Sequence, residues 1–203
     1  MEPSIDSGSE YREIMSTHRL LLFCDLALAA RVERVEVQLI AEASRAAQRR
    51  RFESPGFVIP VAGGVASFAE EGSPWNKVAG LGFAGVPDLA ELAETERAFA
   101  ARGAPVQVEL CQLADPTIGA LLTERGYRLE SFENVLGRAL DRAPDPVGAP
   151  GVEARRSGDE EFDRWLQVVA DGAAHPDTQG VPAYEEFPRD IYEAAERDMA
   201  AAS

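Results

Sequence analysis

Residues 115–142 constrain the fold more than any other part of this chain. Asp115 and Pro116 form a favourable helix start, because aspartate caps a helix and proline fits its first position. Gly126 then ends the helix, as a glycine just past a helix often does. Residues 127–140 alternate and are rich in strand-forming side chains, which predicts a strand or a bent pair of strands. Between the helix start and Gly126, apolar residues recur at helical spacing, at Ile118, Leu121 and Leu122.

The part of the chain before residue 115 contains patterns that are typical of helices and of strands. Residues 23–51 carry an apolar helical pattern, in which several valines leave open a break into two helices. Residues 89–101 carry a second such pattern, closed by Gly103. Runs of strand-forming residues bounded by glycine, proline and turn residues predict strands at residues 57–61, 65–69, 76–83 and 105–113. This order of elements predicts an α/β fold.

The strand at 105–113, the short helix, the Gly126-Tyr127 pair and the final strand resemble the end of a GNAT superfamily N-acetyltransferase domain. The resemblance runs over roughly residues 23–142, about two-thirds of the chain. It implies a GNAT-like acyl-CoA N-acyltransferase fold, with a mixed, mainly antiparallel sheet flanked by helices. It also implies acetyl-CoA as the co-substrate and a small amine as the acceptor.

The same resemblance, with composition, predicts four segments. Residues 1–17 are polar and lack a period, which is typical of a loose tail. The GNAT-like domain is expected over residues 18–142. Residues 143–151 hold three prolines and two glycines, as a linker does. Residues 152–203 then resemble the opening strand and helices of a second, incomplete GNAT domain, which would form a partial, helical C-terminal piece.

Acetyl-CoA would lie, by resemblance, on backbone amides of the loop that precedes the helix at 89–101. The candidate cofactor-binding residues are therefore Phe83, Gly85 and Leu89. Only Gly85 matches a glycine of the family's pattern; Pro87 removes one amide donor, and Asp88 adds a negative charge where phosphate would sit. A strand bulge followed by a helix-entry turn is the alternative interpretation of the glycines here.

Two residues are candidates for catalysis. Glu109 lies in the predicted strand at 105–113, where burial would raise the pKa of its carboxyl group and suit it to act as a base. Tyr127 keeps a hydroxyl group that could protonate a leaving thiolate. Leu122 stands where the resembled family usually has its tyrosine acid. The alternatives are a solvated strand face for Glu109 and a packing aromatic for Tyr127.

The formal net charge is −15, which predicts that neither nucleic acid nor an anionic membrane is a partner. Much of this negative charge lies near the C-terminus, in acidic residues of a predicted helix. These residues form a solvated helix face or, alternatively, attract an amine substrate. Cys24 and Cys111 have apolar neighbours, which indicates reduced thiols, and no cysteine–histidine cluster indicates a metal. The acidic residues of this helix are Glu185, Glu186, Asp190, Glu193 and Asp198.

The apolar run at residues 20–30 is too short to cross a bilayer, and Asp25 interrupts it. The residues before it are acidic, whereas a signal peptide begins with basic residues, so we predict a cytoplasmic protein. By resemblance the function is acetyl transfer from acetyl-CoA to an amine, weak or absent in this chain. The alternative is a non-catalytic pseudo-acetyltransferase that acts as a binding or dimerisation module, with a homodimer as the possible assembly.

Overall fold

The structure is a computed structural model, and the helices and strands that it describes lie in one compact unit made of Asp25–Ser131 and Arg156–Ser203. The second unit consists of Met1–Cys24 and Phe132–Arg155. The predicted tail at 1–17 and the predicted linker up to residue 150 lie outside the described residues. The structure describes residues 22–53, 55–137, 151–153, 155–175 and 186–202.

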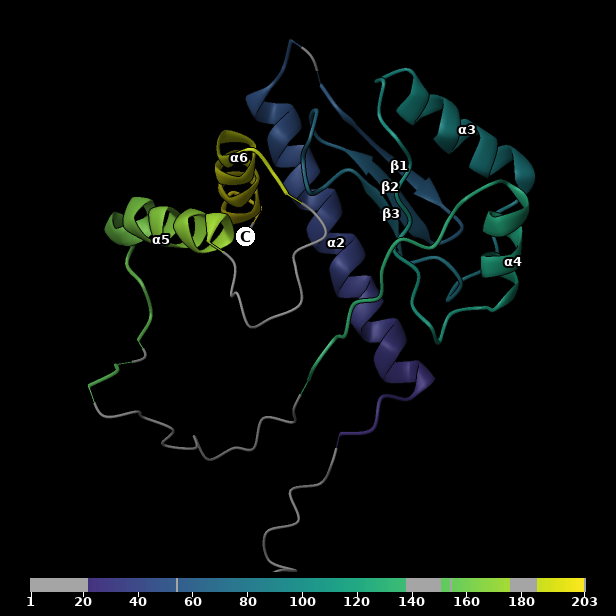
Figure 1. Ribbon diagram of the computed structural model, residues 1–203, viewed down its shortest axis with the longest axis horizontal. Coiled ribbons are helices and arrows are strands. Elements are labelled where there is room, and N and C mark those ends of the chain that lie inside the picture. The colour runs from purple at the N-terminus through teal and green to yellow at the C-terminus, as the bar shows by residue number, and fades with distance from the viewer. Residues whose placement is uncertain (1–21, 54, 138–150, 154, 176–185, 203) are drawn as a thin grey trace, which may run out of the picture. The chain divides into compact units, whose positions relative to one another are not determined.

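Three short antiparallel strands form the sheet, in the order β1-β2-β3 (Figure 1). Ala62 and Gly63 form the tight turn between β1 and β2, and both have positive φ, 44° and 82°. Such a two-residue turn matches the twist of the strands that it joins. The strands are β1 (Phe57–Val61), β2 (Gly64–Phe68) and β3 (Lys77–Ala79).

Helix α3 (Leu89–Ala100) carries the chain from β3 to an extended segment that lies parallel to β3. Val78 donates its N–H to the Gln107 carbonyl at 2.8 Å and accepts from the Glu109 N–H at 2.9 Å. The strand predicted at 105–113 is thus present only as a single parallel bridge at Val108. Beyond this bridge β3 ends, because Gly80 turns the backbone away with φ of 79°.

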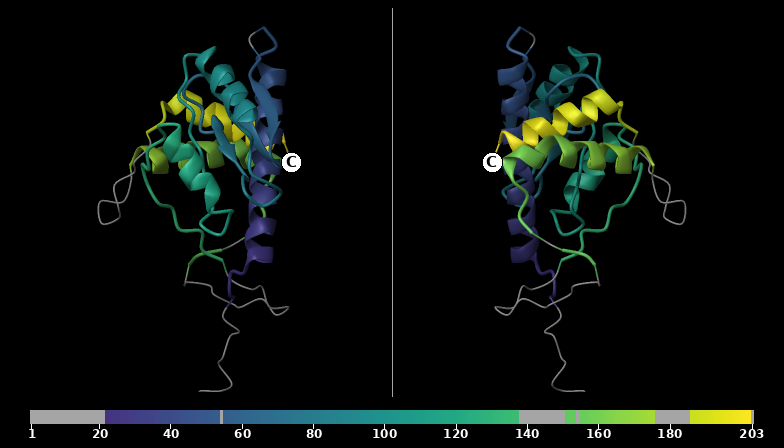
Figure 2. Two further views of the ribbon diagram at one scale, coloured as in Figure 1. Left: turned by 90° about the vertical axis from the view of Figure 1, so that its right-hand side faces the viewer. Right: turned by 90° about the vertical axis from the view of Figure 1, so that its left-hand side faces the viewer.

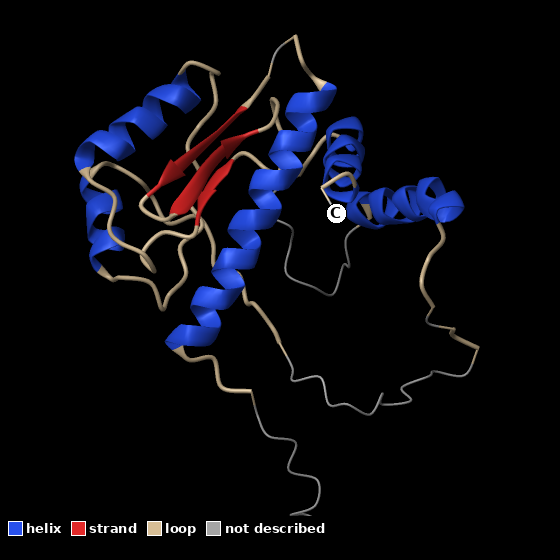
Figure 3. Cartoon of the chain, turned by 180° about the vertical axis from the view of Figure 1, so that it is seen from behind, coloured by secondary structure: helices blue, strands red, loops and turns tan. Residues whose placement is uncertain are grey.

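Helices cover both faces of the sheet, as seen from behind in Figure 3. Helix α2 (Leu26–Arg50) is one continuous helix on one face, where its Ile40 packs with Val65 and Ala79. Helices α3 and α4 (Thr117–Glu124) lie on the other face, around a core that contains Phe68, Val78, Phe99 and Ile118. The alternation along β2 decides which side chain joins which core. This mixed α/β architecture with helices on both faces agrees with the predicted fold class at that level.

The C-terminal part forms a helical pair. A 3₁₀ turn, η1 (Asp159–Glu161), leads into α5 (Phe162–Ala174), and α6 (Arg189–Ala200) follows. Both helices pack against each other, and α6 also packs against α2, as the side views in Figure 2 show. The two predicted helices of this region are therefore confirmed as helices.

Two predicted strands are wrong over the residues that the structure describes. Residues 127–137 form no strand, and their large apolar side chains from Leu129 onward are exposed, from 70% at Phe132 to 91% at Leu136. Residues 138–140 of this predicted strand lie outside the described part. A short strand at 152–156 does not form in the described residues there either. A strand needs a neighbour to bond its backbone, and the alternating pattern that predicted these strands says nothing about such a neighbour.

Candidate functional site

An open cavity of about 520 Å³ lies between the first turns of α2 and the loop that follows β3. Asp25 stands at the start of α2, where its Oδ1 accepts the Leu28 N–H at 2.8 Å and caps the helix. Of the predicted cofactor-binding residues, Phe83 lines this cavity. The lining residues are Asp25, Leu26, Ala27, Ala30, Gly82 and Phe83.

Two glycines shape the loop beside this cavity. Gly80 and Gly82 have φ of 79° and 87°, a region that side chains with a Cβ rarely adopt. A Cβ on Gly80 would stand 2.3 Å from Val37 Cγ2, and one on Gly82 would stand 2.8 Å from the Cβ of Ala114. The loop therefore packs closely against α2 and against the residues before α4. Both glycines thus lie in the turn that follows β3.

Glu33 is a site residue that the sequence reasoning missed. It lies four residues before Val37 and seven before Ile40, within the stripe of the long helix that faces the sheet. Burial raises the pKa of its half-buried carboxyl group, against a hydrogen bond from the Gly80 N–H, and Glu109 and Glu36 raise it further. The sequence signal for this position was an acidic residue spaced so that it falls on the apolar face of the helix.

The two predicted catalytic residues do not meet. Glu109 is exposed and forms an ion pair with Lys77. Lys77 is paired with Ser67, whose hydroxyl contacts Ser44 of α2, so this ion pair lies on the face of the sheet that α2 covers. Tyr127 packs against the core on the opposite face. Its hydroxyl donates to Glu96 Oε1 at 3.4 Å, and burial raises its pKa to about 12. The sheet separates these residues, so they cannot act together as base and acid on one substrate.

The N-terminus of α3, where pyrophosphate would be expected, is capped by the chain itself. Asp88 Oδ1 accepts the N–H groups of Ala90 and Glu91, each at 2.8 Å, and the Glu91 carboxylate accepts the Asp88 N–H at 2.9 Å. Gly85 has φ of 149° and open space beside it. Leu89 is 63% exposed. The structure thus places Gly85 and Leu89 at a helix entry whose amide donors already bind carboxylates.

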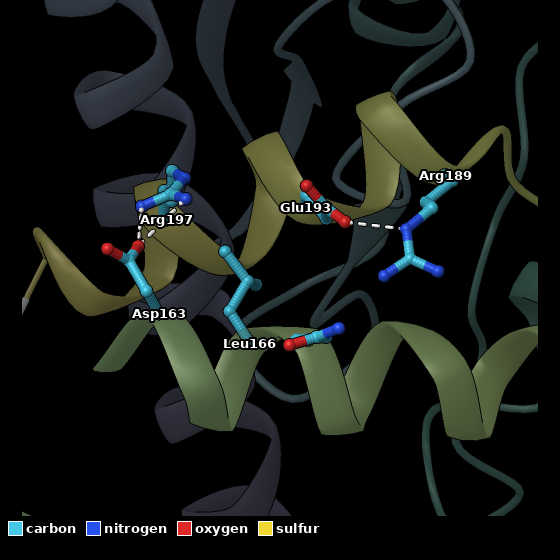
Figure 4. A pocket seen from close by; sticks show the side chains of 6 residues that line it. Asp163, Leu166, Arg189, Glu193 and Arg197 are labelled. Carbon is cyan, nitrogen blue, oxygen red and sulfur yellow. Dashed lines mark hydrogen bonds and ion pairs between the residues drawn. The ribbon is translucent and has the colours of Figure 1, made fainter. Parts of the chain in front are cut away.

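A second cavity, of about 360 Å³, lies between α5 and α6 (Figure 4). The buried Leu166 lies beneath it. Arg189 binds Glu193 at 2.7 Å and Asp171 at 2.6 Å, and Arg197 binds Asp163 at 3.1 Å. The pairs Arg189–Asp171 and Arg197–Asp163 join the two helices, whereas Arg189–Glu193 lies within α6. Both arginines that face the cavity already have carboxylate partners.

In the part of the chain that the structure describes, no group of three or more histidine, cysteine or acidic residues is placed to hold a metal ion. None of the helices described is both long enough and apolar enough to cross a membrane. Comparison with protein-family models, with curated proteins and with solved structures finds no match for this chain.

Proposed function

We propose that this chain is a non-catalytic pseudo-acetyltransferase, which binds a small amine in the cavity beside α2 and transfers no acetyl group to it. The resemblance of residues 23–142 to GNAT domains supports the family part of this proposal. So does the connection from β3 through α3 to a parallel segment at Val108, because parallel neighbours need such a crossover. We also propose that the protein is cytoplasmic and forms a homodimer.

The capping of α3 by Asp88 and Glu91 is the observation that carries this proposal. A phosphate group at a helix N-terminus needs free amide donors and a favourable field. Here the N–H groups of Ala90 and Glu91 bind the Asp88 carboxylate. Two negative side chains on the first turn would also repel the pyrophosphate of acetyl-CoA. In addition Leu122, at the place of the family's acid, is buried in the core and has no proton to donate.

The amine part of the proposal depends on the cavity between α2 and the loop after β3. Its walls include Leu26, Ala30 and Phe83, which suit an apolar body, and Asp25 supplies a carboxylate at one end. Glu33 lies one turn along α2 from Ala30, and side chains on a helix lean toward its N-terminus. A net charge of −15 further favours a cationic ligand over an anionic one.

Calorimetry at low salt tests both parts. We expect 2-phenylethylamine to bind, 3-phenylpropionate to show no heat, and acetyl-CoA to show none. The variant Asp25→Asn removes the charge but keeps a good helix cap, so its fold should persist while amine affinity falls about tenfold, as for the loss of one charged contact. Equal binding of the amine and the propionate, or heat from acetyl-CoA at micromolar concentration, would contradict the proposal.

Weak acetyl transfer is the second candidate, and the raised pKa of Glu33 favours it, because a general base works best when its pKa is near the working pH. Mass spectrometry of 2-phenylethylamine incubated with acetyl-CoA and the protein would detect the acetylated product. Product that disappears in Glu33→Gln would establish this candidate in place of the first one. Product that persists in that variant would exclude Glu33 as the base.

A further inference from the structure

Charged and polar groups connect the C-terminal helical pair, α5 and α6, to the rest of the compact unit. Arg50, at the end of α2, binds Asp198 on α6 through two hydrogen bonds, Nε to Oδ1 at 3.1 Å and Nη2 to Oδ2 at 2.8 Å. The Asp198 side chain is 5% exposed. The Trp75 indole N–H also donates to the Ala195 carbonyl at 3.3 Å.

Arg50 has a second carboxylate partner, which does not belong to the helical pair. Its Nη2 also bonds with Glu70, which follows β2 and has a side chain only 6% exposed. Arg51 Nη1 reaches the other oxygen of Glu70 at 2.5 Å. Glu70 is thus held by Arg50 of α2 and by Arg51, the residue just after the helix. The hydrogen bond of Arg50 to Asp198 is the main cause that raises the Arg50 pKa.

This arrangement makes the joint asymmetric. Breaking a buried ion pair is costly mainly when it leaves one charge buried without a partner. If α6 moved away, Asp198 would become hydrated and Arg50 would keep Glu70, so no such charge would remain. The fully buried residues of α6 are Ala195 and Asp198. By contrast, β2 is buried along its whole length.

From this geometry we infer that α5 and α6 form a reversibly docked arm, and that Arg50 holds Glu70 in the docked and in the released state. Docking adds the Asp198 carboxylate to an arginine that is already paired. Release uncovers the end of α2 and frees the Trp75 indole N–H.

Hydrogen exchange of the full chain tests this inference through the variant Asp198→Asn. We expect amides of α6 to exchange roughly 10- to 100-fold faster, the effect of losing charge-assisted hydrogen bonds, while amides of β2 keep their wild-type rates. Glu193→Gln is the matched control, because it removes an exposed ion pair of the same helix. Its exchange rates should stay within about twofold of wild type.

Glu70→Gln should affect a larger part of the protein, because it removes the carboxylate partner of Arg50 that belongs to the core. Exchange should then rise in β2 and in the last turns of α2 as well as in α6. In a Trp165→Phe background Trp75 is the one remaining tryptophan, and its emission should shift to the red in Asp198→Asn. If amide exchange in Asp198→Asn becomes faster by the same factor in β2 and in α6, the arm unfolds only together with the core. If the exchange rates of α6 do not change, Asp198 does not hold the arm. Either result overturns the inference.

Discussion

Asp88 and Glu91 cap the first turn of α3 reciprocally, each carboxylate accepting the backbone N–H of the other residue. This capping box stabilises the helix and at the same time occupies the donors that an anionic cofactor would need. One local sequence feature therefore fixes a helix start and argues against a phosphate site there.

The capping box predicts the effect of two substitutions. Asp88→Ala should lower the free energy of unfolding by about 1 kcal/mol, because two amides of the first turn lose their acceptor. Asp88→Ser should cost less than about 0.5 kcal/mol, since serine also caps well. Urea denaturation at neutral pH measures both. Equal losses in the two variants would show that the charge of Asp88, and not its capping bonds, stabilises α3.

Gly80 and Gly72 form a matched pair of glycines with similar backbones. Their φ values are 79° and 72°, but a Cβ on Gly80 would meet Val37 at 2.3 Å, whereas one on Gly72 would meet nothing within 4 Å. Gly72→Ala should therefore cost about 1 kcal/mol for the backbone alone. Gly80→Ala should cost about 3 kcal/mol, because overpacking adds to the backbone cost. Urea denaturation of both variants checks the difference, and equal costs would mean that α2 yields without penalty.

The hydroxyl groups of Ser44 on α2 and Ser67 on β2 form a hydrogen bond, and both residues are fully buried. Changing either serine to alanine should cost about 1–3 kcal/mol, because the remaining hydroxyl keeps no partner. The double variant should cost less than the sum of the two single changes. A double-mutant cycle of unfolding free energies measures this coupling. Strict additivity would show that the two hydroxyls do not depend on each other.

Glu33 should make stability depend on pH. Its folded-state pKa is raised above the usual value of 4.5, so the folded protein binds this proton more tightly than the unfolded chain does. Its contribution is fully present below the unfolded pKa and is lost as pH rises through the folded pKa. Relative to wild type, Glu33→Gln should therefore gain stability as pH rises from about 4 to neutrality. Urea midpoints across this range measure the gain, with the exposed Glu94→Gln as the control; a gain as pH falls would contradict it.

Tyr127 should stay protonated well into the alkaline range. Burial raises its pKa to about 12 from 10.0, so its contribution to stability persists below pH 10 and is lost as pH rises through about 12. A spectrophotometric titration of wild type and Tyr127→Phe should differ by one phenol that ionises near pH 12. A difference centred near pH 10 would place the hydroxyl in water.

Helices were well predicted because their signals are local. Apolar residues spaced for one face, with Gly103 after α3 and Gly126 after α4, indicate the helix and its end within a few residues of sequence. The third strand and the parallel segment were predicted too long. A strand's length depends on partners that the alternating pattern does not reveal, and β3 ends where Gly80 leaves the ladder.

The sequence by itself therefore determined the α/β class and the helices, because helical patterns depend on neighbours along the chain. The tertiary structure decided the rest. It placed Glu33 against Gly80, put Glu109 and Tyr127 on opposite faces of the sheet, and buried Asp198 beside Arg50 although its helix read as a solvated acidic face. The Glu33–Gly80 and Asp198–Arg50 contacts join residues far apart in sequence, and they form because α2 packs against the sheet and against α6.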